Sequence, residues 1–151
     1  MNHQIENKDK LLHLDQQVCF TIYACSREII QLYRPFLKEL DLTYSQYLVM
    51  LVLWEHKKVT MSELGRYLYL DNGTLTPLIK RLIIAGLVQK KRSSEDERVV
   101  HITLTEDGLT LREKAYEIPN SIMPLLTKDP SIKDKIENLL SIIQSENEKK
   151  S

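Results

Sequence analysis

Glycine, proline and cysteine are scarce in this chain, and long apolar runs are missing. Its 151 residues include 4 Gly, 5 Pro and 2 Cys, and no 18 consecutive residues are apolar. Few helix-breaking residues favour a mainly helical protein, and without a long apolar run we expect no membrane span. Residues 1–10 are polar and lack an apolar signal core. We therefore expect a disordered tail there and a cytoplasmic protein.

The two cysteines follow no pattern typical of a metal site or a structural disulfide. Cys19 and Cys25 form no CxxC motif, and the 4 histidines are scattered along the chain. Zinc sites use closely spaced Cys and His ligands, so we expect neither a metal nor a cofactor. On one helix, a separation of six residues turns by about 240°, which points the two thiols to different sides.

Charge of one sign does not dominate the chain as a whole. The 21 basic and 21 acidic residues cancel, which argues against a uniformly basic nucleic-acid coat. The basic residues are nevertheless concentrated within residues 76–101, where they outnumber the acidic ones. Salt screens charges that lie more than about 10 Å apart, so DNA responds to such a local excess.

The most informative segment spans residues 70–83. Asp71 or Asn72 can cap a helix, and apolar residues then recur at i, i+3, i+4, i+7 and i+8 from Leu75 to Ile83. Gly86 ends this helix. The side that faces away from the core suits base edges and phosphates, so this helix is a candidate DNA-recognition helix. The predicted DNA-contacting residues of the helix and its cap are Asp71, Asn72, Thr74, Thr76, Lys80 and Arg81.

A β-hairpin is predicted directly after this helix. Two strands, at 87–92 and 99–104, flank a polar turn at 93–98. Lys90, Lys91 and Arg92 on the first strand can meet phosphates, and Arg98 at the tip can enter a minor groove. The acidic residues in the turn suit DNA only if Asp96 holds the Arg98 guanidinium in a fork. A solvated turn of mixed charge is the alternative.

The recognition helix at 70–83 and the hairpin at 87–104 together are called the reader. The remaining residues are predicted to form helices on both sides of it. A winged helix covers its own core with about 70–90 residues, so the terminal amphipathic helices need another partner. We expect them to pair with a second copy and to place two readers on one pseudo-palindromic DNA site. The chain is thus predicted to be mainly α with a small β-hairpin wing. It forms a single winged-helix domain over residues 11–151, with a DNA-binding core at about 43–104 and dimerisation helices at about 11–40 and 106–148.

Local signals set the expected boundaries of these helices. The first helix is expected over residues 11–33, with a bend or restart at Pro35. Thr43 caps the second helix, and a capping box at Thr60 opens the third. A short extended piece at residues 58–59 separates these two helices. Thr105 caps the helix after the hairpin, Pro119 interrupts the pattern, and a last helix covers residues 131–145.

Several motifs together resemble the MarR family of bacterial transcription regulators, and more narrowly its OhrR-type branch, which senses organic hydroperoxides. The motifs are Leu-Asp-Asn-Gly-Thr-Leu-Thr-Pro at 70–77, Asp-Glu-Arg at 96–98, Gln-Val-Cys-Phe at 17–20, Tyr-Ser-Gln-Tyr at 44–47 and Leu-Trp-Glu at 53–55. The resemblance covers residues 12–124. It implies a dimeric repressor whose recognition helix enters the major groove and whose Arg98 enters the minor groove. Asn72 stands where relatives usually have Ser, which leaves the base preference open.

Cys19 has two interpretations. Taken alone, a cysteine in an apolar helix behaves as a small buried hydrophobe, whereas a sensor needs an accessible thiolate with nearby donors. The resemblance implies a sensing cysteine at Cys19, hydrogen-bonded by two tyrosines of the partner subunit at the positions of Tyr33 and Tyr44. It implies oxidation by peroxide, condensation with a small thiol, and release of the operator. Since no cysteine follows Cys25, the chain resembles the one-cysteine kind, and Cys25 is interpreted as a bystander.

Three other functions stay open at this stage. The same DNA reader could respond to a small phenolic or aromatic ligand, with Cys19 inert. A thiol peroxidase would need a resolving cysteine, a base and oxyanion donors, and none of these is evident. A helical interaction module would never touch DNA. We expect a DNA-binding regulator rather than an enzyme, and we interpret Tyr23 and Trp54 as core or interface packing.

Overall fold

The computed structural model describes residue 8 and residues 10–150. Nearly all of the tail predicted at residues 1–10 lies outside this range. The chain forms two compact units, which divide between Ala115 and Tyr116. Within the described residues, no helix combines the length and the apolar character needed to cross a membrane.

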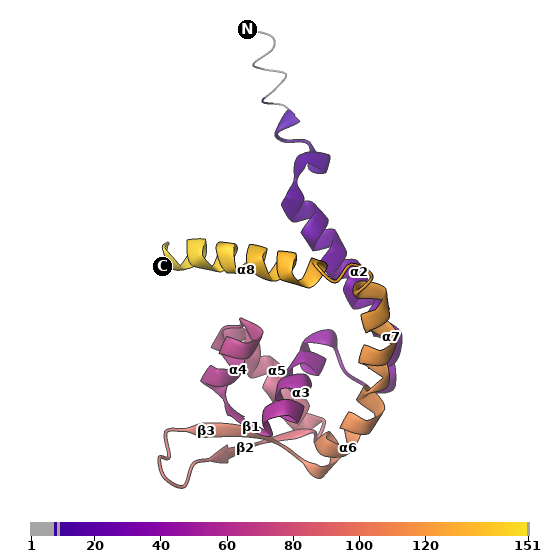
Figure 1. Ribbon diagram of the computed structural model, residues 1–151. Coiled ribbons are helices and arrows are strands. Elements are labelled where there is room, and N and C mark those ends of the chain that lie inside the picture. The colour runs from indigo at the N-terminus through magenta and orange to yellow at the C-terminus, as the bar shows by residue number, and fades with distance from the viewer. Residues whose placement is uncertain (1–7, 9, 151) are drawn as a thin grey trace. The chain divides into compact units, whose positions relative to one another are not determined.

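The first unit alternates helices with three short strands (Figure 1). Its elements are η1 (Leu14–Gln16), α2 (Val18–Glu39), α3 (Tyr44–His56), β1 (Lys58–Thr60), α4 (Met61–Leu68), α5 (Asn72–Ile84), β2 (Val88–Arg92), β3 (Val100–Leu104) and α6 (Glu106–Ala115). The second unit consists of α7 (Glu117–Leu126) and α8 (Ile132–Glu148).

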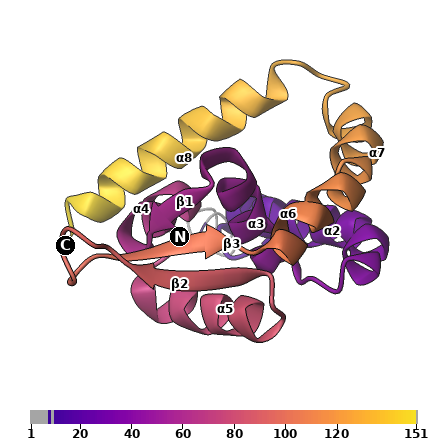
Figure 2. The same ribbon diagram turned by 90° about the horizontal axis from the view of Figure 1, so that it is seen from below.

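The three strands form one antiparallel sheet in the order β1-β3-β2. Val59 of β1 pairs with Ile102 of β3, which in turn pairs with Lys90 of β2. Val59 and Ile102 are buried, so this side of the sheet faces the core. Figure 2 shows α5 running alongside β2, and the turn between β2 and β3 extends beyond the helices of this unit. A hairpin that projects next to a helix is the arrangement of a winged helix-turn-helix.

Side-chain caps begin four of these helices where the sequence predicts them, including Thr105, whose hydroxyl oxygen accepts from the Gly108 N–H at 3.1 Å at the start of α6. Thr43 and Gln46 form a complete capping box at the start of α3, and Thr60 and Glu63 form another at α4. The Asp71 side chain caps α5, which decides between the two candidate caps in favour of Asp71. Each cap gives a hydrogen-bond partner to an N–H group that the helix itself leaves unpaired.

The core of the first unit lies between α3, α4, α5 and the sheet. The apolar stripe predicted for α5 is buried at Leu75, Leu78, Ile79 and Leu82. Ile83 was expected in the same stripe, but 37% of it is exposed. At 100° per residue, Ile83 lies about 80° around the helix from Leu75, at the margin of the buried face.

The first long helix differs from its predicted bounds at both ends. Residues 14–16 form a 3-10 turn, and Gln17 is extended, so α2 begins at Val18 rather than at residue 11. The Gln17 side chain donates to the Leu11 carbonyl at 2.6 Å and thereby fixes this irregular segment. The predicted restart at Pro35 was wrong, because α2 continues through it to Glu39. The proline costs one backbone hydrogen bond, which this long packed helix tolerates.

Smaller differences concern the other boundaries. The helix break near Pro119 falls earlier, at Tyr116, and Pro119 lies in the first turn of α7. N–H groups in the first turn have no intrahelical acceptor, so a proline is tolerated there. The last helix extends three residues further than predicted, to Glu148.

Two helices leave apolar faces exposed. On α2, the exposed apolar side chains are Val18, Phe20, Ile22, Tyr23, Ile30 and Leu32. On α8 they are Ile132, Ile136, Leu140, Ile142 and Ile143, and no residue of α8 is buried. Exposed apolar patches of this kind mark surfaces that bind a partner.

Candidate nucleic-acid interface and thiol site

Asp71 organises the start of the predicted recognition helix. Its Oδ1 accepts a hydrogen bond from the backbone N–H of Thr74 at 2.8 Å, and its Oδ2 accepts one from the Thr74 hydroxyl at 3.0 Å. These hydrogen bonds, the backbone one foremost, hold the pKa of Asp71 below its usual range. Asp71 and Thr74 therefore shape the start of α5, of which Asn72 is the first residue.

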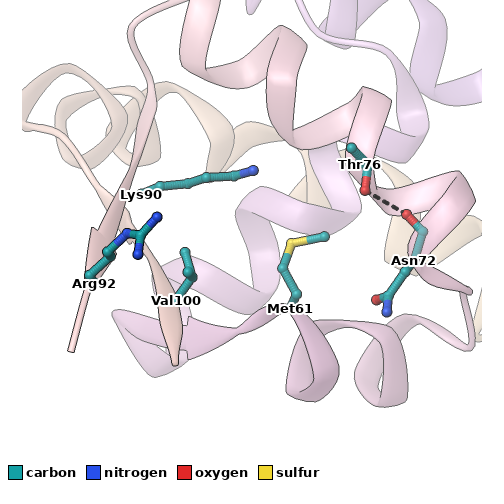
Figure 3. Close-up of a pocket in the computed structure, with 6 residues that line it drawn as sticks. All are labelled: Met61, Asn72, Thr76, Lys90, Arg92 and Val100. Atoms are coloured by element: carbon teal, nitrogen blue, oxygen red, sulfur yellow. Dashed lines mark hydrogen bonds between the residues drawn. The ribbon is translucent and has the colours of Figure 1, made fainter. Parts of the chain in front are cut away.

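A hollow of about 570 Å³ lies between α5 and the strands of the wing (Figure 3). Asn72 and Thr76 of α5 form one wall, and Lys90 and Arg92 of β2 form the other. The Thr76 hydroxyl donates to the Asn72 carbonyl at 2.7 Å, so its lone pairs remain available to a donor. Amide and hydroxyl groups thus face two cations, a set of groups that suits phosphate and base-edge contacts.

Two residues of this hollow were not predicted as site residues. Met61 begins α4 directly after β1, and Val100 pairs with Arg92 in the β2–β3 register. Both line the hollow with apolar atoms. The alternation of side chains along a strand could have placed Val100 beside Arg92, but only once the hairpin register was known.

Lys80 and Arg81 do not line the hollow, although both were predicted to contact DNA. They are exposed on the second half of α5. Lys80 lies four residues after Thr76, so it occupies nearly the same face one turn further along the helix. The structure thus brings Asn72, Thr76 and Arg92 together and leaves the two later cations on the adjoining surface.

The wing tip is folded by its own polar side chains. The Ser93 hydroxyl oxygen accepts from the backbone N–H groups of Glu95 and Asp96 at 3.2 and 3.4 Å. Asp96 Oδ1 accepts from the backbone N–H of Arg98 at 2.9 Å. The predicted fork between Asp96 and the Arg98 guanidinium was wrong, since no ion pair joins these two described side chains. An Asp side chain reaches the N–H two residues ahead more readily than a long arginine tip.

Tyr33 of α2 and Tyr44 of α3 lie in contact. Their ring centroids are 5.0 Å apart, in an edge-to-face arrangement. Burial raises the pKa of Tyr33, with a further contribution from Tyr44, and burial also raises the pKa of Tyr44. Both phenols therefore stay protonated and can donate hydrogen bonds at neutral pH.

Cys19 is exposed and far from these phenols within its own chain. It is the second residue of α2, and Tyr33 follows 14 residues later on the same helix, roughly 21 Å away at 1.5 Å per residue. The interpretation of Cys19 as a buried hydrophobe does not fit this exposure. Cys25 is exposed as well. Within one chain, the Tyr33–Tyr44 pair therefore does not reach the Cys19 sulfur.

The two other aromatic residues singled out from the sequence behave differently. Trp54 is buried, and its Nε1–H donates to the Gly108 carbonyl at 2.8 Å. Tyr23 is 59% exposed, and the Arg27 guanidinium lies 5.7 Å from its ring centroid. Across the described residues, no three His, Cys, Asp or Glu side chains are grouped closely enough to hold a metal ion.

Comparison with known proteins identifies relatives over most of the chain. The family described as "Transcriptional regulator SarA/Rot" matches residues 31–115. The chain is 52% identical to the organic hydroperoxide resistance transcriptional regulator of Bacillus subtilis (strain 168), over 80% of this chain and 82% of that protein. These two matches confirm the prediction of a transcription regulator rather than an enzyme.

Solved structures share the fold. Reduced AbfR bound to DNA superposes with a TM-score of 0.80 at 37% identity, over 91% of this chain and 97% of that chain, and AbfR comes from Staphylococcus epidermidis. Disulfide-formed AbfR superposes with a TM-score of 0.65, over 89% of this chain and 98% of that chain. The predicted mainly helical, winged helix-turn-helix fold is confirmed by these matches. The chain belongs to the MarR/SarA family of transcriptional regulators, in the redox-sensing branch that contains the organic hydroperoxide resistance regulator and AbfR.

Proposed function

We propose that this protein is a dimeric DNA-binding repressor that senses organic peroxides through Cys19 and releases its operator when Cys19 is oxidised. The observation that carries the proposal is the separation of the thiol from its phenols. Cys19 is exposed at one end of α2, while the Tyr33–Tyr44 pair lies four turns away. A dimer resolves this separation, because the tyrosines of one copy can serve the thiol of the other.

The DNA-binding surface consists of the polar side of α5 together with the wing. Asn72 and Thr76 face base edges when α5 lies in a major groove, and Lys90 and Arg92 across the hollow meet the phosphates that border it. Arg98 at the wing tip enters the neighbouring minor groove, whose negative potential attracts a guanidinium. A relative of the same fold, reduced AbfR, is described as bound to DNA.

The exposed faces of α2 and α8 support a homodimer. Both carry several apolar side chains that the described chain leaves in solvent. A second copy can cover each of these faces, and twofold symmetry places the two α5 helices about 34 Å apart, one turn of DNA. The proposed operator is therefore a pseudo-palindrome in cytoplasmic DNA.

The proposed trigger is a two-electron oxidation of sulfur. The Cys19 thiolate attacks one oxygen of the peroxide, the O–O bond breaks, and an alcohol leaves as the sulfur becomes a sulfenic acid. A small cellular thiol then condenses with the sulfenic acid, which forms a mixed disulfide and releases water.

Oxidation changes DNA affinity only as far as it stabilises one arrangement of the dimer over the other. The added group and the lost phenol contacts favour a spacing of the readers that does not match the operator. Roughly 3–4 kcal/mol of such differential stabilisation removes most occupancy.

The test is operator release by titrated organic peroxide. Wild type, Cys19→Ser and Cys25→Ser are compared side by side with labelled operator DNA. We expect wild type and Cys25→Ser to release the DNA and Cys19→Ser to retain it. Equal release from Cys19→Ser and wild type would eliminate the thiol trigger and favour a small phenolic ligand as the signal.

A further inference from the structure

A row of aromatic rings leads away from the Tyr33–Tyr44 pair into the core. The Tyr33 ring lies 5.9 Å from the ring of Tyr47, and Tyr47 lies 6.2 Å from Trp54. Tyr47 and Trp54 are both buried on α3, seven residues apart and therefore on one face of that helix. The row thus runs from the half-buried Tyr33 of α2 to the buried Trp54 of α3.

The row ends at the junction between α6 and the first strand of the wing. Trp54 Nε1–H donates to the Gly108 carbonyl of α6 at 2.8 Å, in a buried position. Gly108 lies against the chain just before β2, where an added Cβ would stand only 2.1 Å from the Leu87 carbonyl oxygen.

Thr105 joins the same two segments by hydrogen bonds. Its hydroxyl donates to the Gly86 carbonyl at 2.6 Å, and its backbone N–H donates to the Leu87 carbonyl at 3.1 Å. Hydrogen bonds therefore join the base of the wing to the start of α6, and another joins α6 to Trp54.

We propose that Trp54 is a positioning residue that transmits the state of the Tyr33–Tyr44 pair to the base of the wing. A phenol that gains or loses a bond to a thiol shifts its ring, and the close-packed neighbours Tyr47 and Trp54 must follow. The hydrogen bond from the Trp54 N–H to the Gly108 carbonyl then shifts Gly108, and the start of β2 moves with it. The proposal rests on the proposed function for the identity of the thiol that the tyrosines contact.

The junction has little room to absorb such a shift. The Trp54 N–H is an indole donor in a buried site, and losing its acceptor would leave a polar group without a partner. Gly108 lies against the backbone carbonyl of Leu87, so no side chain at this contact can rotate away to make room. Movement of Trp54 is therefore passed on to the backbone of the wing base.

Trp54 is the single tryptophan of the chain, so its fluorescence reports directly on this relay. We expect organic peroxide to change the Trp54 emission of wild type, with no change in Cys19→Ser and a smaller change in Tyr33→Phe. Tyr67→Phe is the matched control, because Tyr67 stacks on His56 outside the row and should leave the response intact. Trp54 emission that stays constant while wild type releases its operator would overturn the proposal.

The second readout is the ratio of operator affinities in the reduced and oxidised states. We expect Trp54→Phe, which keeps a ring and loses the N–H, to lower that ratio at least about fivefold. Gly108→Ala acts on the same junction from the other side and should lower it as well. Leu109→Ala, at the neighbouring exposed position, should not. An unchanged ratio in a folded Trp54→Phe protein would contradict the relay.

A double-mutant cycle separates failure of the relay from failure of the peroxide proposal. Operator affinity is measured without oxidant for Tyr33→Phe, Trp54→Phe and the double variant. Non-additive effects support the relay even if peroxide does not act through Cys19, and additive effects refute it. Circular dichroism and thermal unfolding establish whether each variant is folded. If Trp54→Phe does not fold, the fluorescence test on the wild-type protein decides whether the relay exists.

Discussion

Asp96 Oδ1 accepts a hydrogen bond from the backbone N–H of Arg98 at 2.9 Å, so the acidic residue shapes the backbone that presents the arginine. Among the described side chains, no ion pair joins the Asp96 carboxylate to the Arg98 guanidinium. The Arg98 side chain is therefore not held by Asp96, and the acidic turn must be compatible with DNA in another way than through a fork.

Arg98→Ala should weaken operator binding by about tenfold and reduce the slope of log affinity against log salt by about 1. The physical reason is the loss of one cation from the minor groove and of the counterions that it releases. Fluorescence anisotropy at several salt concentrations gives both quantities. Glu97→Ala, at the adjacent exposed position, is the control, and an Arg98→Ala variant with wild-type affinity and slope would contradict insertion of the wing.

Asp96→Ala should also weaken operator binding, but it should leave the salt slope near the wild-type value. This substitution removes the acceptor that orders the turn and leaves the arginine in place. Asp96→Asn keeps an acceptor oxygen and should bind more tightly than Asp96→Ala. If removal of the negative charge strengthens binding in both variants, the ordering role assigned to Asp96 is wrong.

The capping box at α4 should make stability depend on acid. The backbone hydrogen bond from Thr60, and after it the Thr60 hydroxyl, hold the pKa of Glu63 below its usual 4.5. A carboxylate with a depressed pKa in the folded state contributes fully above pH 4.5, and this contribution is lost as the pH falls through the folded value.

Glu63→Gln keeps the capping geometry and should flatten this acid dependence. Urea unfolding midpoints between neutral pH and pH 3 provide the measurement, and the two proteins are compared at each pH. Parallel pH profiles for wild type and Glu63→Gln would show that Glu63 does not contribute.

The buried aromatic row should make the protein sensitive to alkali. Burial, together with the charges of Tyr33 and Tyr44, raises the pKa of Tyr47 from 10.0 to about 12. A raised pKa favours the neutral phenol, so its stabilising contribution is present below pH 10.0 and is lost as the pH rises toward 12. Tyr47→Phe should lose less stability than wild type across this interval, as measured by urea unfolding. The same loss in both proteins would contradict the prediction.

Ile136→Glu on α8 should dissociate the proposed dimer and weaken operator binding. Ile136 is 60% exposed in the single chain, and a buried unpaired charge at the proposed interface is costly. Sedimentation velocity at micromolar concentration measures the oligomeric state. Asn138→Glu, about 200° around the helix, is the control and should remain dimeric. A dimeric Ile136→Glu protein with normal DNA binding would exclude this face from the interface.

Local chemistry made the reader predictable from the sequence. Thr43, Thr60 and Asp71 cap their helices through residues three positions away, so the signals that start the helices lie within one turn of chain. The apolar stripe of α5 needs only its own periodicity. Where the outcome depends on a competing local contact, as with Gln17 before α2 and Asp96 in the wing, the sequence pattern led to wrong details.

Long-range pairing accounts for the parts of the site that the sequence did not predict. Met61 reaches the hollow because Thr60 of β1 pairs with His101 of β3, 41 positions later. The Trp54–Gly108 contact spans 54 positions and follows from no motif. The link that we propose between Cys19 and the tyrosines involves a second molecule, so neither periodicity nor spacing within one chain could supply it.

The order β1-β3-β2 leaves β2 at one border of the sheet, with an unpaired row of backbone N–H and C=O groups. Such a border invites strands of other molecules to add on, the first step toward aggregates. Lys90, Lys91 and Arg92 lie along this border and repel any basic strand that approaches. The cations that we propose to contact DNA also disfavour self-association of the free protein through its wing. Variants that neutralise them should therefore become less soluble as well as weaker binders.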